Sequence, residues 1–526
     1  MTMADRSPRT VADLMSSPVV TASPEEKVAE AAARMRAHRV GSVVAVDGDR
    51  PVGILTERDL VRIAAAGADT GTVTVREWMT PDPDTVGPDV AATTAFASLA
   101  ERGYRHIPVV TDGRLVGIVS MRDLMRVAQI QPADRLAHEV PKGLEGVVVA
   151  ETTVGDVRGL EGFYHYRQYS AVELAETRSL EDTWYLLFRG DLPDRAAAEA
   201  FRAEIAPLRE VPAPLAELLP ELARRAPQAA PLDLLRTTVS MLAAIEGFRP
   251  SLDADRTELE RQALRVCAVV PTLLCATWRL QHGLEPVPPD GTLGYAANYL
   301  AMLHGRVPAP EHARAIEQYL ISTIDHGFNA STFTARVIAS TGADLGAAVV
   351  GAIGALSGPL HGGAPSRALQ MLDEIGTPER AEAWLREAVA RGERLMGFGH
   401  RVYKTDDPRS VMLRGVAERL GGPKVAFAKQ VERTAVQVLA EMKPGRRLYT
   451  NVEFYAGVVM DTCGVPREMF TPTFASSRVI GWCAHVLEQA ADNRLIRPSA
   501  RYVGPPPPQP VPPRDETGSQ PGGAGS

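Results

Sequence analysis

Cysteine is scarce in this sequence: 4 residues among 526, with none in a CxxC or Cys/His zinc spacing. We therefore expect reduced thiols in a reducing compartment and no metal site. A strong charge of one sign is lacking as well. The formal net charge of -7 gives the whole chain no attraction to nucleic acid or to an anionic membrane.

Long hydrophobic runs are also missing. The run VCAVVPTLLCATW from Val266 is interrupted by Pro271 and falls short of the ~20 residues that span a bilayer. The first residues, MTMADRSPRTVADLMSS, lack the apolar core of an export signal. These absences predict a cytoplasmic protein that does not bind membranes. A chain of 526 residues is too long for one hydrophobic core, so several domains are predicted.

Two stretches near the start repeat each other without a gap. VADLMSSPVVTASPEEKVAEAAARM from Val11 aligns with VREWMTPDPDTVGPDVAATTAFASL from Val75. RPVGILTERDLVRI from Arg50 likewise aligns with RLVGIVSMRDLMRV from Arg114. The offset is 64 residues throughout, which indicates a duplicated module. Each copy is predicted to form a helix, two β-rich runs joined by a tight turn, and a second helix.

The second helix of each copy begins with a hydroxyl and a carboxylate that share one helical face. These pairs are Thr56 with Asp59 and Ser120 with Asp123. A hydroxyl beside helix-start amides can meet a phosphate, and the carboxylate can accept from a ribose, although helix capping explains the same spacing. The paired arrangement resembles the CBS domain. This resemblance implies that the four residues line clefts for an adenine nucleotide such as ATP, ADP, AMP, NADH or S-adenosylmethionine.

The remainder of the chain is predicted to be mainly helical. Segments such as APLDLLRTTVSMLAAIEGF and TELERQALRVCAVVPTLLCATWRL carry apolar residues at three- and four-residue spacing. The polar stretch QPADRLAHEVPK is typical of a linker, and the Pro- and Gly-rich end is typical of a disordered tail. The predicted boundaries are a flexible N-terminus at 1–10, repeats at 11–66 and 75–130, a linker at 131–142, a body at 143–503 and a tail at 504–526.

Three histidines each adjoin a glycine at the edge of an apolar segment: His326 in DHGFNASTF, His361 in GPLHGG and His400 in GFGH. A lone histidine so placed is usually a satisfied core or turn residue, but three alike with arginines downstream favour a polar pocket. They lack HxxxH or HExxH metal spacing, and the chain shows no nucleophile elbow, Walker A loop or dinucleotide fingerprint. What remains is acid–base chemistry on an anionic carbonyl substrate.

Six motifs, in family order, resemble citrate synthase. They are HGFNASTFTARVIAST, GALSGPLHGGA, MGFGHRVYKTDDPR, TNVEFYAGV, FTPTFASSRVIGW and RLIRPSARYVG. GLEGVVVAETTVGDVRGLEGFYHYRQYSAVELA is similar to the opening segment of the family, so the resemblance covers about 143–504. It implies a multi-domain chain in which an α/β CBS pair precedes a mainly α body. That body would combine a large helical domain with a small one inserted at about 362–464.

The resemblance also implies roles for individual residues. His361 matches the histidine that stabilises the enol of acetyl-CoA, and His400 matches the one that polarises and protonates the oxaloacetate carbonyl. Binding of the substrate carboxylates is implied for four residues, the last from a partner subunit: His326, Arg409, Arg478 and Arg497. CoA binding is implied for a loop and two nearby cations: Leu395, Met396, Gly397, Phe398, Gly399, Arg401 and Lys404.

The catalytic base departs from the family pattern. The family has an aspartate in NVDFYSG, whereas this chain has Glu453 in TNVEFYAG. The two carboxyls have similar reference pKa values, ~3.9 and ~4.3, but the extra methylene shifts the oxygens unless the backbone compensates. A misplacement of ~1 Å can reduce a rate on the order of 100-fold. We expect Glu453 to act as the base; a slow enzyme and a binding shell without turnover are the alternatives.

The sequence therefore predicts an acyltransferase that condenses acetyl-CoA with oxaloacetate, regulated by an adenine nucleotide at the CBS pair. A 2-methylcitrate synthase using propionyl-CoA is an alternative, because one methylene is worth only ~1–3 kcal/mol in a pocket. A nucleotide-sensing regulatory protein with weak turnover is another. No tightly bound cofactor is expected, and the resemblance implies a homodimer or a higher homo-oligomer.

Overall fold

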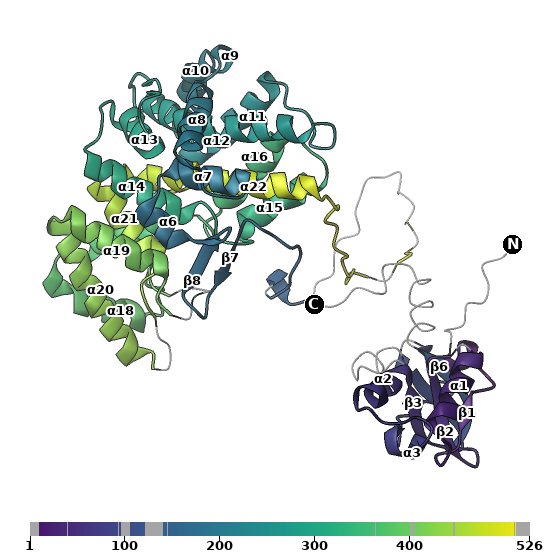
Figure 1. Ribbon diagram of the computed structural model, residues 1–526. Helices are drawn as coiled ribbons and strands as arrows, with labels where there is room; N and C mark the ends of the chain where they lie inside the picture. Colours follow the sequence, from purple (N-terminus) through teal and green to yellow (C-terminus); the bar gives the residue numbers. More distant parts are fainter. Residues whose placement is uncertain are drawn as a thin grey trace, which may run out of the picture. The chain divides into compact units, whose positions relative to one another are not determined.

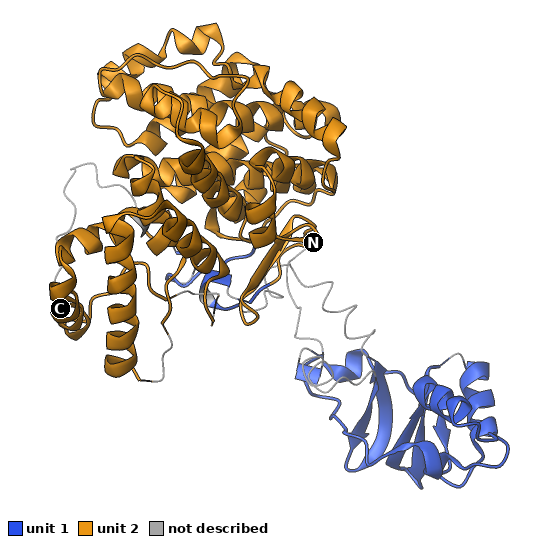
Figure 2. Ribbon diagram, turned by 60° about the vertical axis from the view of Figure 1, so that its left-hand side comes forward, with its two compact units in different colours: residues 1–147, 498–526 blue, residues 148–497 orange. Residues whose placement is uncertain are grey.

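The chain folds into two compact units, residues 1–147 with 498–526 and residues 148–497 (Figure 2). The computed structural model describes residues 10–38, 40–92, 94–95, 106–120, 140–144, 146–362, 364–399, 403, 405–444, 448–505, 507–509 and 511. Each unit buries hydrophobic clusters of its own.

The first unit is built from short strands and helices. Its elements are β1 Thr21–Ala22, α1 Val28–His38, β2 Ser42–Asp47, β3 Arg50–Thr56, α2 Glu57–Ala65, α3 Val75–Trp78, β4 Thr80–Pro81, β5 His106–Thr111 and β6 Arg114–Ser120. Strands β1 to β4 form one sheet in that order, with β1 parallel to β2 and the other pairs antiparallel. Strands β5 and β6 form an antiparallel hairpin.

The two repeats share even a local irregularity. The register between β2 and β3 shifts between Ala45 and Val46. The register between β5 and β6 shifts between Val109 and Val110, the equivalent positions of the second copy. The duplication predicted from the sequence is therefore present in the pairing of the strands.

The repeats are also joined by reciprocal packing. A Cβ on Gly53 would lie 2.1 Å from the Sδ of Met79, and a Cβ on Gly117 would lie 2.4 Å from the Sδ of Met15. Each methionine comes from the first segment of one copy and packs on a glycine of the other. A side chain at either glycine would displace the methionine from its present position.

The second unit begins with a small antiparallel sheet formed by β7 Gly155–Arg158, β8 Phe163–Tyr166 and β9 Tyr169–Ser170 (Figure 1). Its helices follow as α6 Ala171–Thr177, α7 Leu180–Arg189, α8 Arg195–Ile205, α9 Ala213–Ala216, α10 Leu219–Arg225, α11 Pro231–Ile245, α12 Arg256–Gln281, α13 Tyr295–His304, α14 Pro310–Thr323, α15 Ala330–Ser340 and α16 Leu345–Leu356. The chain continues with α17 Ala364–Ile375, α18 Ala381–Ala390, α19 Pro408–Leu420, α20 Pro423–Met442, α21 Val452–Thr462 and α22 Phe470–Ala491. Helix α18 packs on α20, while α17 and α19 pack on α21.

Helix α12 contains the predicted helical segment TELERQALRVCAVVPTLLCATWRL, and it continues through Pro271. Proline has no N–H to donate to the carbonyl four residues earlier, which here belongs to Cys267. The hydroxyl of Tyr295 lies 3.2 Å from the Cys267 carbonyl oxygen and 2.6 Å from that of Ser476, so the two carbonyls share its one proton. By length and composition α12 could cross a membrane, but 83% of its apolar window is buried inside the helical body, as in a core helix.

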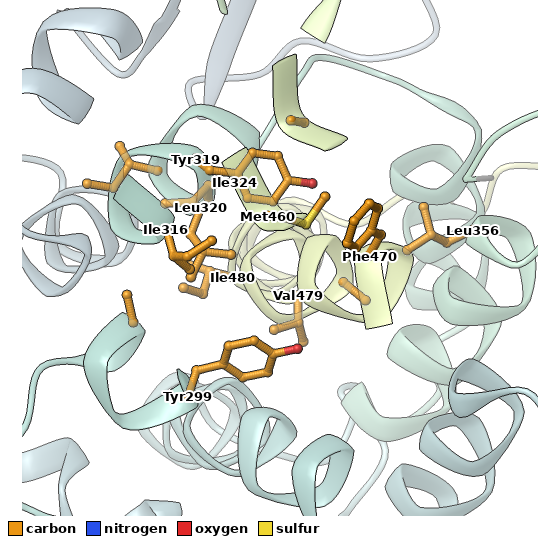
Figure 3. Packing of buried hydrophobic residues seen from close by; sticks show 14 of the residues in the cluster. Tyr299, Ile316, Tyr319, Leu320, Ile324, Leu356, Met460, Phe470, Val479 and Ile480 are labelled. Carbon is orange, nitrogen blue, oxygen red and sulfur yellow. The ribbon is translucent and has the colours of Figure 1, made fainter. Parts of the chain in front are cut away.

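The core between α14 and α22 sets the positions of two predicted site residues. In Figure 3, Ile316 of α14 lies beside Ile480 of α22. Arg478 stands two residues before Ile480, and His326 stands three residues after Thr323, the last residue of α14. The Nε of Arg478 donates to the Thr323 carbonyl over 2.8 Å, so packing of the two helices brings Arg478 to the end of α14, where the His326 loop begins.

Candidate active site

His326 lies in the loop between α14 and α15, next to the buried residue Asp325. Asp325, just before it, is 1% exposed and lies 3.2 Å from the Nε2 of His485 on α22. The Gly327 amide also donates to Asp325, over 3.1 Å. His326 itself meets Tyr403, with 3.0 Å between Nε2 and the phenol oxygen. The loop is thus held by polar contacts from both sides.

The partners of His485 fix its protonation. Nη1 of Arg336 lies 3.0 Å from Nδ1 of His485 and can only donate, so Nδ1 is the acceptor. The ring proton is therefore on Nε2 and is donated to Asp325. Burial alone would raise the pKa of Asp325, but His485, the Arg478 charge and the Gly327 amide lower it. Asp325 is consequently a charged carboxylate inside the protein.

Arg478, on α22, is buried without an acidic partner on its own helical turn. Its Nε donates to the Thr323 carbonyl over 2.8 Å, and its guanidinium lies 4.5 Å from the centre of the Phe474 ring. Burial lowers the pKa of Arg478, whereas the charge of Asp325 raises it and that of Arg409 lowers it further. Arg478 and Arg409 are therefore close enough to repel each other.

Arg409, in the first turn of α19, carries its own counter-ion. Asp407 accepts from Nε over 3.0 Å and from Nη2 over 2.9 Å. Burial would lower the pKa of Arg409, but Asp407 outweighs it and the pKa is raised. Asp407 also accepts from the Val452 amide over 3.0 Å, at the start of α21. One buried carboxylate thus joins a cation on α19 to the helix that carries Glu453.

His361, after α16, is a neutral imidazole. Burial and the charge of Arg478 lower its pKa to about 4. Nε2 lies 2.9 Å from the Ser331 hydroxyl, which can donate, and 3.3 Å from the Ser331 amide, which can only donate. Nε2 is therefore the acceptor, and the ring proton is on Nδ1. Ser331 is itself held, since its hydroxyl accepts from the indole of Trp482 over 3.1 Å. His361 can therefore donate a hydrogen bond from Nδ1 to a carbonyl or enol oxygen.

Glu453 lies in the first turn of α21, partly buried, with Asn451 as the N-cap. Asn451 Oδ1 accepts from the Glu453 amide over 3.1 Å. The pKa of the Glu453 carboxyl is raised to about 7, mainly by burial. The charges of Arg409 and Arg394 oppose this shift, and the charge of Asp407 adds to it. A carboxyl that titrates near neutral pH is suited to removing a proton from carbon.

The predicted CoA loop is tied to the segment that carries Glu453. Phe398 forms a bridge with Thr450, and the Gly399 amide donates to the Tyr449 carbonyl over 2.8 Å. Asn451 donates twice to this loop, from its amide to the Gly397 carbonyl (2.9 Å) and from Nδ2 to the Gly399 carbonyl (2.8 Å). Gly399, the residue before His400, and Asn451, two residues before Glu453, are therefore joined by hydrogen bonds between the two segments.

Five predicted residues thus form one cluster: His326, His361, Arg409, Glu453 and Arg478. The charge of Arg478 lowers the pKa of His361, and the charge of Arg409 lowers the pKa of both Arg478 and Glu453. The rings of Tyr164 and Tyr403 connect His326 to Arg409. Among the residues that the structure describes, no group of three or more His, Cys, Asp or Glu side chains could hold a metal ion.

Arg497, the fourth predicted carboxylate-binding residue, is not in this cluster. Arg497 is exposed on the segment that follows α22. His400, Arg401 and Lys404 lie outside the described residues, as does Asp123 of the second repeat.

In the first repeat, Thr56 and Asp59 contact each other. Asp59 accepts from the Thr56 amide over 2.9 Å and from the Thr56 hydroxyl over 2.8 Å. Arg62 donates to the other oxygen of Asp59 over 2.9 Å. These contacts cap the start of α2, which is the alternative that helix capping offers for the spacing of the pair. Ser120 ends β6 at the equivalent position.

The region that holds the cluster matches the family model "Citrate synthase, C-terminal domain" over residues 143–499. The chain belongs to the citrate synthase family. Its N-terminal unit matches the model "CBS domain" twice, over residues 11–66 and 75–129. The predicted fold class, a CBS pair followed by a mainly helical citrate synthase body, is therefore confirmed. The predicted enzyme class is confirmed with it, since citrate synthases are acyltransferases.

Several relatives cover most of the citrate synthase region. A citrate synthase from Haloferax volcanii is 39% identical over 371 residues, 70% of this chain and 97% of that protein. A 2-methylcitrate synthase from Mycobacterium tuberculosis is 40% identical over 367 residues, 70% of this chain and 91% of that protein.

Solved structures of the family match as well. Citrate synthase from Thermotoga maritima aligns with a TM-score of 0.63 at 37% identity, covering 72% of this chain and 100% of that one. Citrate synthase from Thermoplasma acidophilum, solved as a ternary complex with carboxymethyl coenzyme A and oxaloacetate, aligns with a TM-score of 0.66 at 30% identity. That match covers 71% of this chain and 98% of that one.

Sequence reasoning missed the residues that support the cluster. Asp325, Asp407 and Asn451 each stand within two residues of a predicted site residue, so their motifs contained the signal. Tyr164 is far in the sequence from His326, which it contacts, and His485 is far from Asp325. No local pattern could have assigned them, because their contacts exist only in the folded body.

Proposed function

We propose that this member of the citrate synthase family condenses acetyl-CoA with oxaloacetate and water to give citrate and CoA. The observation that carries the proposal is Glu453, a carboxyl with a pKa of about 7, in one cluster with the neutral imidazole of His361 and two buried guanidinium groups. The reaction needs a base for a carbon-bound proton, a donor for the enol oxygen and cations for carboxylates.

The first step is enol formation. The Glu453 carboxylate removes a proton from the methyl group of acetyl-CoA, and Nδ1–H of His361 donates to the thioester oxygen. A pKa of about 4 means that His361 carries a single ring proton at neutral pH. A neutral imidazole is a far weaker acid than an imidazolium, so it shares this proton with the enol oxygen in a hydrogen bond and does not transfer it. The longer Glu453 side chain, in place of the family's aspartate, would be accommodated by the hydrogen bonds that hold Asn451.

The second step joins the two substrates. The enol carbon bonds to the carbonyl carbon of oxaloacetate while His400 protonates the oxygen that becomes the citrate hydroxyl. Water then cleaves the citryl thioester and releases CoA. His326, Arg409 and Arg478, with Arg497 of the partner subunit, would hold the oxaloacetate carboxylates, since guanidinium groups match carboxylates bidentately. This role implies a homodimer or a higher homo-oligomer.

CoA would bind along the loop Leu395, Met396, Gly397, Phe398 and Gly399. Gly397 and Gly399 have φ values of +85° and +80°, and a Cβ on Gly397 would lie 2.9 Å from the Cβ of Phe454, so glycine allows this loop its tight turns against α21. Arg401 and Lys404 would meet the CoA phosphates. CoA is a substrate here, and the proposal requires no tightly bound cofactor.

The CBS pair would bind an adenine nucleotide that regulates the synthase. Thr56, Asp59, Ser120 and Asp123 would line its clefts. In this structure Asp59 already accepts from Thr56 and Arg62, so a ribose would have to share or displace the Arg62 contact. Calorimetry of the full chain with ATP, ADP, AMP, NADH and S-adenosylmethionine tests the proposal, and an absence of binding by all five would refute it.

A thiol-release assay tests the synthase activity. The full chain is mixed with oxaloacetate and either acetyl-CoA or propionyl-CoA, with and without each nucleotide. Faster CoA release from acetyl-CoA supports a citrate synthase, and faster release from propionyl-CoA supports a 2-methylcitrate synthase. No release from either thioester under any condition would refute both and leave a nucleotide-sensing regulatory protein.

A further inference from the structure

A tyrosine on the first hairpin of the helical body contacts two proposed carboxylate-binding residues at once. Tyr164 lies on β8 and is 1% exposed, and its hydroxyl donates to the Ser322 carbonyl over 3.1 Å. The guanidinium carbon of Arg409 lies 5.9 Å from the centre of its ring. The imidazole centre of His326 lies 5.8 Å from it, with the two planes tilted by 53°.

His326 and Arg409 come from separate parts of the body. His326 lies in the loop between α14 and α15, whereas Arg409 lies at the start of α19, more than eighty residues later. To grip one small dicarboxylate, the two groups must keep a constant separation, since ligand affinity falls when binding groups are not held in place beforehand. An aromatic ring in contact with both provides that spacing, and its face attracts the cation.

The hairpin that carries Tyr164 touches both of these parts. A Cβ on Gly162, in the turn between β7 and β8, would lie 2.8 Å from the Thr405 hydroxyl, next to the segment that leads into α19. A Cβ on Gly155 of β7 would lie 3.6 Å from a carboxylate oxygen of Asp325. The hairpin therefore packs against the Asp325–His326 loop at one end and against the segment before Arg409 at the other.

We propose that Tyr164 is a positioning residue that holds His326 and Arg409 at the separation needed for oxaloacetate. The inference rests on the proposed function. The recorded ring contacts of Tyr164 go to His326, Arg409 and Tyr166. Its effect should therefore fall on oxaloacetate and not on the thioester substrate, whose proposed catalytic residues are His361 and Glu453.

Substitution of Tyr164 by leucine and by phenylalanine tests the proposal. Tyr164→Leu removes the aromatic face, and we expect the KM for oxaloacetate to rise about five- to tenfold with the KM for acetyl-CoA unchanged. Tyr164→Phe keeps the ring and removes only the hydrogen bond to Ser322, so we expect its KM for oxaloacetate to stay near the wild-type value. Calorimetric titration with oxaloacetate should show the same loss of affinity in Tyr164→Leu.

Tyr299→Leu is the matched control, because Tyr299 of α13 is also buried and hydrogen-bonded through its hydroxyl, to Thr473. We expect this variant to lower the Tm with both KM values unchanged. An unchanged KM for oxaloacetate in Tyr164→Leu would overturn the inference, and so would an equal rise of both KM values. If the wild type bound oxaloacetate without releasing CoA, the proposed function would fail, and the titrations would still decide the role of Tyr164.

Discussion

Two buried aspartates, one in each unit, are stabilised in opposite ways. Asp59 of the first CBS repeat accepts from Thr56 at the start of the same helix and pairs with Arg62 one turn later. Asp325 of the synthase body pairs with His485, 160 residues away, and its charge acts on Arg478. A carboxylate with local partners mainly closes its own helix. A carboxylate with distant partners lies where several segments meet, and its charge changes the pKa of site residues on those segments.

The two buried arginines of the cluster extend this contrast. Arg409 has its counter-ion two residues away, and its pKa is raised. Arg478 depends on Asp325 from another element, and its pKa is lowered. Both remain charged at neutral pH, because a guanidinium group is effectively always protonated in proteins. Affinity for an anion in this cluster should therefore be more sensitive to changes around Arg478 than to changes around Arg409.

The largest expected effect belongs to the proposed base. Glu453→Gln should lower kcat by about 10²- to 10⁴-fold, because the amide keeps the shape of the side chain and cannot accept the methyl proton. CoA release under saturating substrates measures this loss. Glu221→Gln, an exposed carboxyl paired with Arg224, serves as the matched control and should leave kcat unchanged. Undiminished activity of Glu453→Gln would contradict the assignment.

The same substitution in the two aspartates tests the central comparison. Asp325→Asn leaves the buried charge of Arg478 without this carboxylate and should lower the free energy of unfolding by about 3–5 kcal/mol. Asp59→Asn should lower it by about 1 kcal/mol, since its partner Arg62 is 64% exposed. Urea unfolding of both variants measures the difference. Equal losses would show that local and distant partners stabilise a buried carboxylate alike.

The activity should depend on pH through Glu453. With a pKa of about 7 for the free enzyme, kcat/KM should fall about tenfold per pH unit on the acidic side, to about 100-fold at pH 5. The pH profile of CoA release checks this. An acidic limb centred near 4.5, the ordinary value of a glutamate, would show that burial does not act on this carboxyl.

The same shift predicts the sign of a stability change. Since the pKa of Glu453 is higher in the folded protein than its ordinary 4.5, its contribution to stability is fully present below pH 4.5 and is lost as the pH rises to about 7. Glu453→Gln should therefore lose less stability than the wild type between pH 5 and pH 7.5. Urea unfolding at the two pH values measures this difference.

The smallest effect is expected at the start of α2. Thr56→Ala removes the hydroxyl that donates to Asp59 and leaves the amide contact, so it should lower the free energy of unfolding by about 0.5–1 kcal/mol. Thermal melting checks it. A loss of several kcal/mol would mean that Thr56 supports more of the CBS unit than its own helix.

Local pattern was sufficient for much of the fold. The 64-residue repeat, the strands at Ser42–Asp47 and Arg50–Thr56 and the helix from Glu57 follow from alternating and helical spacing, and the structure contains them. The spacing also predicts the helix through Pro271, but not the contact that accommodates the proline. Tyr295, from another helix, shares its hydroxyl proton with the carbonyl that proline leaves open, and no local rule contains that contact.

The sequence by itself determined which side chains bring chemistry: the imidazoles, the guanidinium groups and the carboxyl at 453, each marked by its own motif. Only the tertiary structure decided their chemical states. Burial brings the pKa of Glu453 to about 7, and burial with the nearby Arg478 brings that of His361 to about 4. Such shifts arise from desolvation and from charges on distant segments, and neither exists until the chain is packed.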